Sequence, residues 1–236
     1  MKRASVIAAV VSMLIAGPVC AETQSYWGEV SFSSDLQPPD TITLPSFDTT
    51  ELCPEDLPRV LQSVLVEFTY GGSADIAVDN DDEFQGTDAN ARIIRTWSAT
   101  GPDVSEVGAK TLTSAPETLT ADNGDGNAWD PTAPDGHAFT TLSFAGEDGG
   151  SDNPDKSLYE TAGPGTVDFD VTPVNMVNDL QFTVTPDEYQ SEVQNPLMTV
   201  RVDLTYEYAC VPEPGTLLLA VFGAAVLGMV RLRRRR

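Results

Sequence analysis

The sequence predicts an all-β protein: an antiparallel β-sandwich of jelly-roll type, with an N-terminal signal peptide and one short C-terminal transmembrane helix. Apolar and polar residues alternate along several segments, and stretches rich in Gly, Asp, Asn and Pro separate them. Long uninterrupted apolar runs occur only near the two termini. Alternation with a period of two is typical of strands with one buried face. We therefore divide the chain into a signal peptide (1–21), an acidic β domain (22–210) and a C-terminal segment (211–236).

The clearest strand is LMTVRVDLTYEYA at 197–209, where every second residue from Met198 to Tyr208 is apolar or aromatic. The segment VLQSVLVEFTY at 60–70 repeats the pattern, with Val64, Val66, Phe68 and Tyr70 on one face. Weaker candidates occupy residues 26–32, 91–99, 137–145, 165–171 and 179–185. The acidic stretches around 79–90, 121–136 and 146–157 have the composition of turns and loops.

The first 21 residues have the three parts of a secretory signal. Lys2 and Arg3 precede an apolar core at 6–16, and Val-Cys-Ala ends at Ala21. We predict cleavage after Ala21. The alternative is a lipoprotein signal with Cys20 as the modified residue, but Gly-Pro-Val at 17–19 fits that pattern poorly.

The charge of the domain excludes one class of partner, and its cysteines predict a disulfide. Residues 22–210 contain 35 acidic and 6 basic residues, so the domain repels phosphates and we predict no nucleic-acid partner. After cleavage only Cys53 and Cys210 remain, an even pair in an oxidising compartment, which predicts one disulfide. Antiparallel pairing of the strands that adjoin the two cysteines would bring them to the same end of a sheet.

A short apolar helix and a basic tail are predicted at the C-terminus. Residues 216–230 are uncharged and would span about 22 Å as a helix, less than the hydrocarbon thickness of about 30 Å. Basic residues remain cytoplasmic, so the acidic domain lies on the other side of the membrane. A helix this short suits a transient stop. The predicted cytoplasmic stop consists of Arg231, Arg233, Arg234, Arg235 and Arg236.

Val-Pro-Glu-Pro at 211–214, followed directly by the apolar helix and the arginines, resembles the PEP-CTERM sorting domain of Gram-negative bacteria. The resemblance implies that Pro212, Glu213 and Pro214 form the recognition and processing motif for an exosortase. It further implies transient anchoring in the inner membrane, sorting to the cell surface or extracellular matrix, and an association with extracellular polysaccharide, biofilm and floc formation. The alternative is an ordinary single-pass anchor that follows a chance Pro-Glu-Pro.

A second resemblance covers the body of the chain. LPSFDTTE at 44–51, YETAGPGTVDFDVT at 159–172 and VRVDLTYEY at 200–208 are similar to the choice-of-anchor E domain, a β-rich exported module. In that family the first phrase runs almost directly into the next strand, whereas here ELCPEDLPRV intervenes and contains Cys53. This resemblance implies a fold and surface display, and it brings no catalytic residues.

The sequence offers little for catalysis. Its one histidine, His137, lies next to Gly136 in a predicted loop, and no G-x-S-x-G elbow is present. A single histidine and a disulfide leave too few ligands for zinc. Carboxylate pairs are expected by chance among so many acids, so they do not identify a glycoside hydrolase. We predict that the protein is not an enzyme and has no catalytic residues.

No cofactor is predicted, although calcium would suit the acidic loops. Solvated turns, or adaptation to a saline habitat, explain the same acids. The candidate calcium ligands form three groups: Asp79, Asp81, Asp82 and Glu83; Asp122, Asn123 and Asp125; and Asp148, Asp152 and Asp155.

Aromatic residues could also bind sugars by stacking. Of Trp27, Trp97 and Trp129 we expect Trp97 to lie in the core and only Trp129 to be exposed. We predict a structural or adhesive role in exopolysaccharide or biofilm. The alternatives are a secreted carbohydrate-binding module and, less favoured, a secreted hydrolase.

Overall fold

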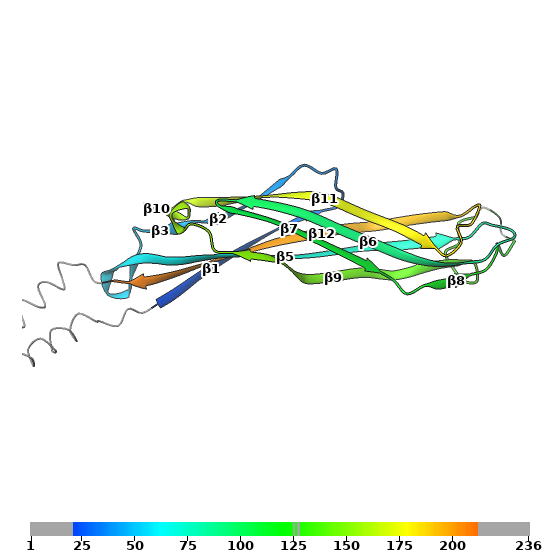
Figure 1. Ribbon diagram of the computed structural model, residues 1–236, viewed down its shortest axis with the longest axis horizontal. Coiled ribbons are helices and arrows are strands. Elements are labelled where there is room, and N and C mark those ends of the chain that lie inside the picture. Colours follow the sequence, from blue (N-terminus) through cyan, green and yellow to red (C-terminus); the bar gives the residue numbers. More distant parts are fainter. Residues whose placement is uncertain (1–20, 125, 127, 212–236) are drawn as a thin grey trace, which may run out of the picture.

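The computed structural model describes residues 21–124, 126 and 128–211. These residues form a long, flattened antiparallel β-sandwich, which confirms the predicted all-β class (Figure 1). The elements in chain order are β1 (Ala21–Phe32), β2 (Asp40–Pro45), β3 (Phe47–Asp48), β4 (Leu52–Cys53), η1 (Pro54–Asp56), β5 (Leu57–Asp79), β6 (Thr87–Gly101), β7 (Val104–Thr113), β8 (Glu117–Leu119), β9 (Gly136–Asp152), η2 (Lys156–Leu158), β10 (Glu160–Thr161), β11 (Thr166–Phe182) and β12 (Gln190–Cys210).

Eight of these strands build two facing sheets. The first sheet has the order β1-β12-β5-β9, with the short β4 also paired to β5, and the second has the order β2-β11-β6-β7, with β8 beside β6. Counted along the chain, the first of the eight pairs with the last, the second with the seventh, the third with the sixth and the fourth with the fifth. This pairing is that of one long antiparallel ribbon rolled into two layers, the jelly-roll arrangement.

The two strands that the sequence predicted best form the middle of the first sheet. β5 and β12 pair antiparallel from Arg59 opposite Cys210 to Asp79 opposite Gln190. The predicted inward residues of β5, from Val64 to Tyr70, are buried, and so are those of β12 from Met198 to Tyr208. Both strands extend beyond their predicted limits. Two register shifts interrupt their pairing, one in β12 between Gln194 and Leu197 and one in β5 opposite Glu207 and Tyr208.

Some strands have other limits than predicted, and some strands were not predicted. The segments 165–171 and 179–185 were expected as separate strands, but β11 runs through the first into the second and ends at Phe182. β9 continues to Asp152 through a stretch expected to be a loop, because pairing with β5 satisfies its backbone despite Gly and Asp residues. β2 and β7 were not predicted. β7 lies at a sheet edge and exposes Val107, so its apolar pattern is weak.

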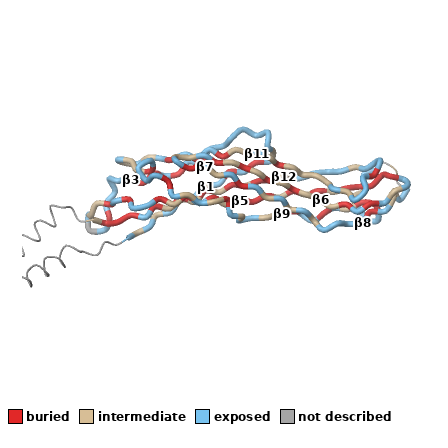
Figure 2. The backbone as a smooth tube through the Cα atoms, viewed as in Figure 1, coloured by how far each residue is buried: buried red, intermediate tan, exposed pale blue. Residues whose placement is uncertain are grey.

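The buried residues run along the whole length of the molecule between the two sheets (Figure 2). They form two hydrophobic clusters, a larger one that contains Phe68, Trp97 and Phe169 and a smaller one that contains Ile76 and Ile93. Along β6, the inward positions 89, 91, 93, 97 and 99 are all apolar, and position 95 between the two clusters is an arginine. The core therefore contains a cation at the boundary between its two parts.

Arg95 is fully buried and bonded to uncharged oxygens of both sheets. Its guanidinium donates to the carbonyls of Leu197 (2.9 Å), Ser73 (2.6 Å) and Val177 (3.0 Å). Two further bonds go to the carbonyl of Ile94 and to Asn178 Oδ1. Burial lowers the pKa of Arg95 to about 10, which leaves it charged at neutral pH.

A glycine makes room for this side chain. A Cβ on Gly72 of β5 would lie 2.6 Å from Arg95 Cγ, closer than two carbon atoms can approach. Leu197, whose carbonyl accepts a hydrogen bond from Arg95, directly follows the bulge in β12. Glycine, bulge and buried cation therefore form one structural unit that joins the two sheets.

We predict that Arg95→Met reduces the free energy of unfolding by about 3 kcal/mol, because several buried carbonyl groups lose their donor. Urea unfolding monitored by tryptophan fluorescence measures the change. Arg92→Met on the same strand is the matched control. Arg92 forms a surface ion pair with Asp179, so its loss should cost less than about 1 kcal/mol. Equal losses in the two variants would contradict a special role for Arg95.

Candidate functional site

The end of the molecule where β1 begins and β12 ends, here called the base, adjoins the C-terminal segment (Figure 1). Cys53 and Cys210 form the predicted disulfide, with their Cα atoms 5.9 Å apart. β12 pairs with β5 up to Cys210, and the next residue, Val211, donates its backbone N–H to the carbonyl of Pro58 at 3.0 Å. The backbone is thus held by covalent and hydrogen bonds up to the residue that precedes Pro212.

Arg59 fills the space beside the disulfide. Its guanidinium carbon lies 4.1 Å from the ring centroid of Tyr208 and 4.8 Å from that of Phe47. The same group forms an ion pair with Glu51 and donates to Gln24 Oε1 at 2.6 Å. Arg59 therefore contacts β1, β12 and the segment around β3 and β4 from its own place on β5. Its cation–π contacts supplement the disulfide.

Loss of the disulfide should destabilise the domain strongly. The bridge closes a loop with a sequence separation of 157 residues. The chain-entropy model gives about 5 kcal/mol for such a loop. We predict that the double variant Cys53→Ser/Cys210→Ser lowers the free energy of urea unfolding by about this amount, and that a reducing agent lowers that of the wild type equally while leaving the variant unchanged. A reductant effect on the double variant would contradict this assignment.

Several predicted features lie outside the described residues. These are the signal peptide up to residue 20, the motif residues Pro212, Glu213 and Pro214, the apolar segment 216–230, and Arg231 with Arg233–Arg236. Ala21, the predicted cleavage residue, is the first residue of β1 and pairs with Ala209. Within the part of the chain that is described, no helix is both long and apolar enough to cross a membrane.

Residues 211–236 match the family described as PEP-CTERM protein-sorting motif. The chain carries a PEP-CTERM sorting signal. A signal of this kind supports an exported protein that an exosortase processes at the membrane. The match confirms the first resemblance, whereas the resemblance of the body to the choice-of-anchor E domain remains a prediction.

Other comparisons add little. No curated protein matches the chain. Solved structures similar to it include the infectious bursal disease virus Gx strain (11% identity, TM-score 0.15, 85% of this chain and 44% of the viral chain) and the T13 particle of the same virus (12%, 0.16, 83% and 41%). The chain thus spans less than half of each viral chain, and TM-scores this low support no inference about fold or function.

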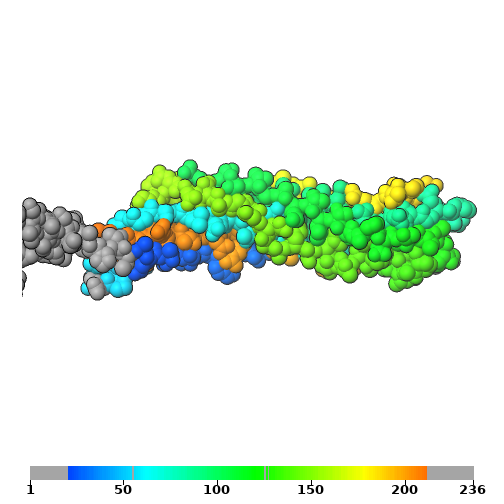
Figure 3. Space-filling view, turned by 60° about the horizontal axis from the view of Figure 1, so that its bottom comes forward, coloured from blue at the N-terminus to red at the C-terminus, as the bar shows by residue number. Residues whose placement is uncertain are grey.

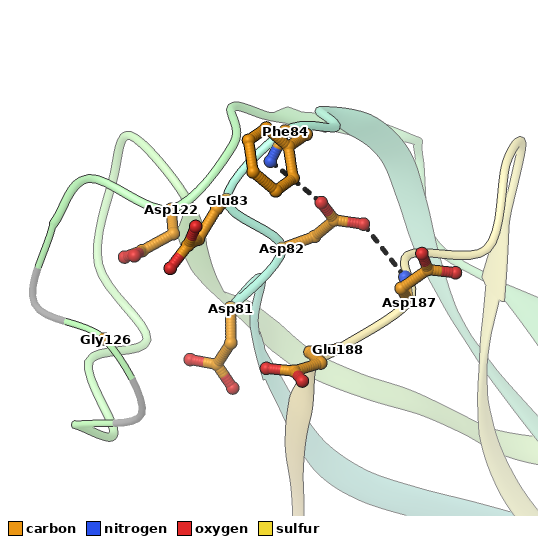
Figure 4. Close-up of a pocket in the computed structure, with 8 residues that line it drawn as sticks. All are labelled: Asp81, Asp82, Glu83, Phe84, Asp122, Gly126, Asp187 and Glu188. Carbon is orange, nitrogen blue, oxygen red and sulfur yellow. Dashed lines mark hydrogen bonds between the residues drawn. The ribbon is translucent and has the colours of Figure 1, made fainter.

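The end opposite the base, here called the acidic tip, consists of the loops at 80–86, 120–135 and 183–189 (Figure 1). It contains an open hollow of about 300 Å³ (Figure 4). Two of the three predicted acidic groups meet there, through Asp81, Asp82 and Glu83 from one loop and Asp122 from another. The structure adds Asp187 and its neighbour Glu188, which no local pattern could predict because Asp187 is 105 residues away from Asp82 in the chain.

The buried carboxylates of the acidic tip hold its loops together. Asp82 accepts the backbone N–H groups of Phe84 (2.9 Å), Gln85 (3.0 Å) and Asp187 (2.9 Å), and Figure 4 shows the first and last of these bonds. Asp79 accepts the N–H of Asp130 at 2.8 Å, and Asp135 accepts that of Asn123 at 2.7 Å. Asp79 and Asp82, two of the acids proposed as calcium ligands, thus anchor one loop to the next.

Calcium gains no support from this geometry. Among residues 21–124, 126 and 128–211, no three acidic, histidine or cysteine side chains are arranged to hold a metal ion. Asp125 lies outside this part of the chain. In the third group, Asp148 and Asp152 lie on β9, where they accept N–H bonds from Gly150 and Asn153, and Asp155 caps η2 through Ser157.

The hydrogen bonds from Asp187, Phe84 and Gln85 hold the pKa of the Asp82 carboxyl below its usual value. A depressed folded-state pKa contributes stability that is present above the unfolded pKa of about 3.9 and is lost as pH falls through the folded value. We predict that Asp82→Asn lowers the melting temperature at pH 7 and that this deficit shrinks below pH 4. Glu83→Gln, in the same loop but exposed, should show no such pH-dependent difference. A deficit that is constant from pH 7 to pH 2.5 would exclude this role for Asp82.

The aromatic residues differ in part from expectation. Trp97 is fully buried, as predicted, and Trp129 is 38% exposed. The prediction that only Trp129 is exposed was wrong, because Trp27 is 61% exposed. Its neighbour Tyr26 packs inward on Tyr206, so the alternation of β1 places Trp27 on the outer face. His137 lies in β9, not in a loop, and its ring packs edge-on against Phe139.

Proposed function

We propose that this PEP-CTERM protein is a non-catalytic, structural or adhesive component of the extracellular polysaccharide or biofilm of a Gram-negative bacterium. The observation that carries the proposal is the arrangement of the base. The chain is fixed up to Val211, and the sorting motif begins at that residue. While the C-terminal segment is held at the membrane, the folded domain therefore starts immediately next to it.

The shape of the domain supports an extended role. The strands run along the long axis, and the acidic tip lies at the end remote from the base (Figure 1). β5 alone has 23 residues, which at about 3.3 Å per residue is roughly 75 Å. Because the charge is strongly negative, such domains repel one another and remain soluble when displayed at high density. A rigid spacer of this kind suits a structural or adhesive component better than a compact catalyst.

Processing can be tested by intact-mass and C-terminal peptide spectrometry of the protein from the inner membrane, outer surface and medium of its native host. We predict that the surface or medium form ends near Pro212–Pro214 and lacks Arg231 and Arg233–Arg236. A host that lacks the exosortase is the control, and it should retain the arginines in the inner membrane fraction. If every wild-type molecule keeps its arginines and stays in the inner membrane, sorting to the surface is excluded.

The role in the matrix needs a separate measurement. Deletion of the gene should weaken biofilm or floc cohesion under shear, and complementation should restore it. Complementation with a chain in which Pro212, Glu213 and Pro214 are replaced by alanine should fail, since that variant is made but not sorted. Unchanged cohesion after deletion would refute the structural or adhesive role while leaving the sorting assignment intact.

A further inference from the structure

The outer face of the first sheet carries two adjoining hollows of about 390 and 290 Å³. Thr69, Gly146 and Asp203 line both, so the two form one trough, here called the outer furrow. It crosses β12, β5 and β9 and reaches Glu29 on β1. Figure 3 shows β1 (blue), β12 (orange) and part of β5 (cyan) side by side on one face of the molecule. At about 4.8 Å between strands, four strands span about 15 Å.

The floor of the outer furrow is backbone. A Cβ on Gly71 would lie 2.9 Å from the carbonyl oxygen of Phe144 and 3.1 Å from Thr199 Oγ1, so a larger residue would displace β9 or fill the furrow. Gly146 on β9 has a φ of +66°, a conformation that favours glycine. Two glycines on neighbouring strands thus keep this part of the sheet free of side chains.

Trp27 stands beside the outer furrow and is held in place. The guanidinium carbon of Arg201 lies 4.5 Å from the ring centroid of Trp27. Arg201 is in turn fixed by two hydrogen bonds to the carboxylate of Asp203, at 2.7 and 2.5 Å. A single exposed aromatic residue needs no explanation. Arg201, however, fixes the Trp27 ring beside a furrow whose floor is backbone. The ring and the furrow together form a preorganised contact surface.

The charges of the outer furrow limit what it can bind. The outer furrow is lined by four acids, Glu29, Glu67, Asp148 and Asp203, and by one cation, Arg201, whose charge Asp203 already neutralises. A polyanion would be repelled. Carboxylates and Thr hydroxyls accept hydrogen bonds from hydroxyl groups, and the face of an indole ring packs against the C–H groups of a sugar. An uncharged polysaccharide meets both requirements, and an open trough admits a chain that continues beyond it.

We propose that the outer furrow binds an uncharged polysaccharide, with one sugar ring stacked on Trp27 and sugar hydroxyls bonded to Asp203, Glu29 and Thr69. The inference deepens the proposed function, because it names the matrix component and the face that contacts it. It does not depend on the sorting signal. In this arrangement the long side of the domain contacts the polymer, and the acidic tip need not take part.

Affinity electrophoresis of the full chain in detergent tests the proposal, with gels that contain hydroxyethyl cellulose, dextran or galactomannan as uncharged probes and alginate as the anionic probe. We expect retardation by at least one uncharged probe and none by alginate. Trp27→Ala should weaken binding about tenfold or more. Trp129→Ala is the matched control, an exposed tryptophan at the acidic tip, and should bind as the wild type does. Trp27→Phe should retain most of the affinity.

Several outcomes would overturn the proposal: no retardation by any uncharged probe, retardation by alginate alone, or equal binding by wild type and Trp27→Ala. A loss of binding in Trp129→Ala but not in Trp27→Ala would assign the site to the acidic tip and would also overturn it. If Trp27→Ala instead abolishes a dimer seen by light scattering, the face is a protein interface. Melting curves of each variant exclude unfolding as the cause of a loss.

Failure of the proposed function can be told apart from failure of this inference. Glycan binding that requires Trp27, in a protein whose deletion leaves biofilm cohesion unchanged, keeps the site and removes the matrix role. If the wild type binds no uncharged glycan but is sorted, and its deletion weakens cohesion, the matrix role stands and the site is removed.

Discussion

The antiparallel ladder between β5 and β12 is the constraint on which the rest of the structure depends. β1 pairs with the free edge of β12, and β9 with the free edge of β5, so the first sheet is assembled on this pair. The disulfide closes one end of the ladder and the loops of the acidic tip extend from the other. Because the inward residues of both strands supply much of the larger hydrophobic cluster, the second sheet also packs on this ladder.

Irregularities in this ladder serve particular purposes. Leu197 directly follows the bulge in β12, and its carbonyl accepts a hydrogen bond from Arg95 of the opposite sheet. Gly71 and Gly72 are consecutive residues of β5. Gly72 leaves room for Arg95 on the inner face, and Gly71 forms part of the floor of the outer furrow. A single step along β5 thus links the joint between the sheets to the candidate binding face.

The strands could be predicted from the sequence where one face is fully buried and the other is exposed to solvent. Val64, Val66 and Phe68 show this contrast, and so do the inward residues of β12. Prediction failed where burial is incomplete, as in β7, and where pairing outweighs composition, as in the Gly- and Asp-rich end of β9. The disulfide followed from cysteine number and strand order, and the structure confirms it. The membrane segment remains a prediction, because it lies outside the described residues.

The candidate sites were less predictable than the fold. Asp82 contacts Asp187, and Trp27 contacts Arg201. Both contacts join segments that are more than 100 residues apart in the chain. Periodicity within a segment gives the two faces of a strand, but only the register between strands shows which residues adjoin on one face. Arg95 could be noticed in the sequence as a charged residue in a row of inward apolar positions. Only the structure shows which groups accept its hydrogen bonds.

The pairing of the first strand with the last has a consequence for how the chain folds. The ribosome completes β12 last, and until then β1 has no partner and β5 lacks one neighbour along most of its length. Contacts of such high sequence separation make folding slow, because loop closure must precede most of the stabilising pairing. Since the sorting signal follows β12 immediately, the domain cannot be complete until the chain has been made up to that signal. Strand order alone therefore makes the sorting signal available before the domain can finish folding.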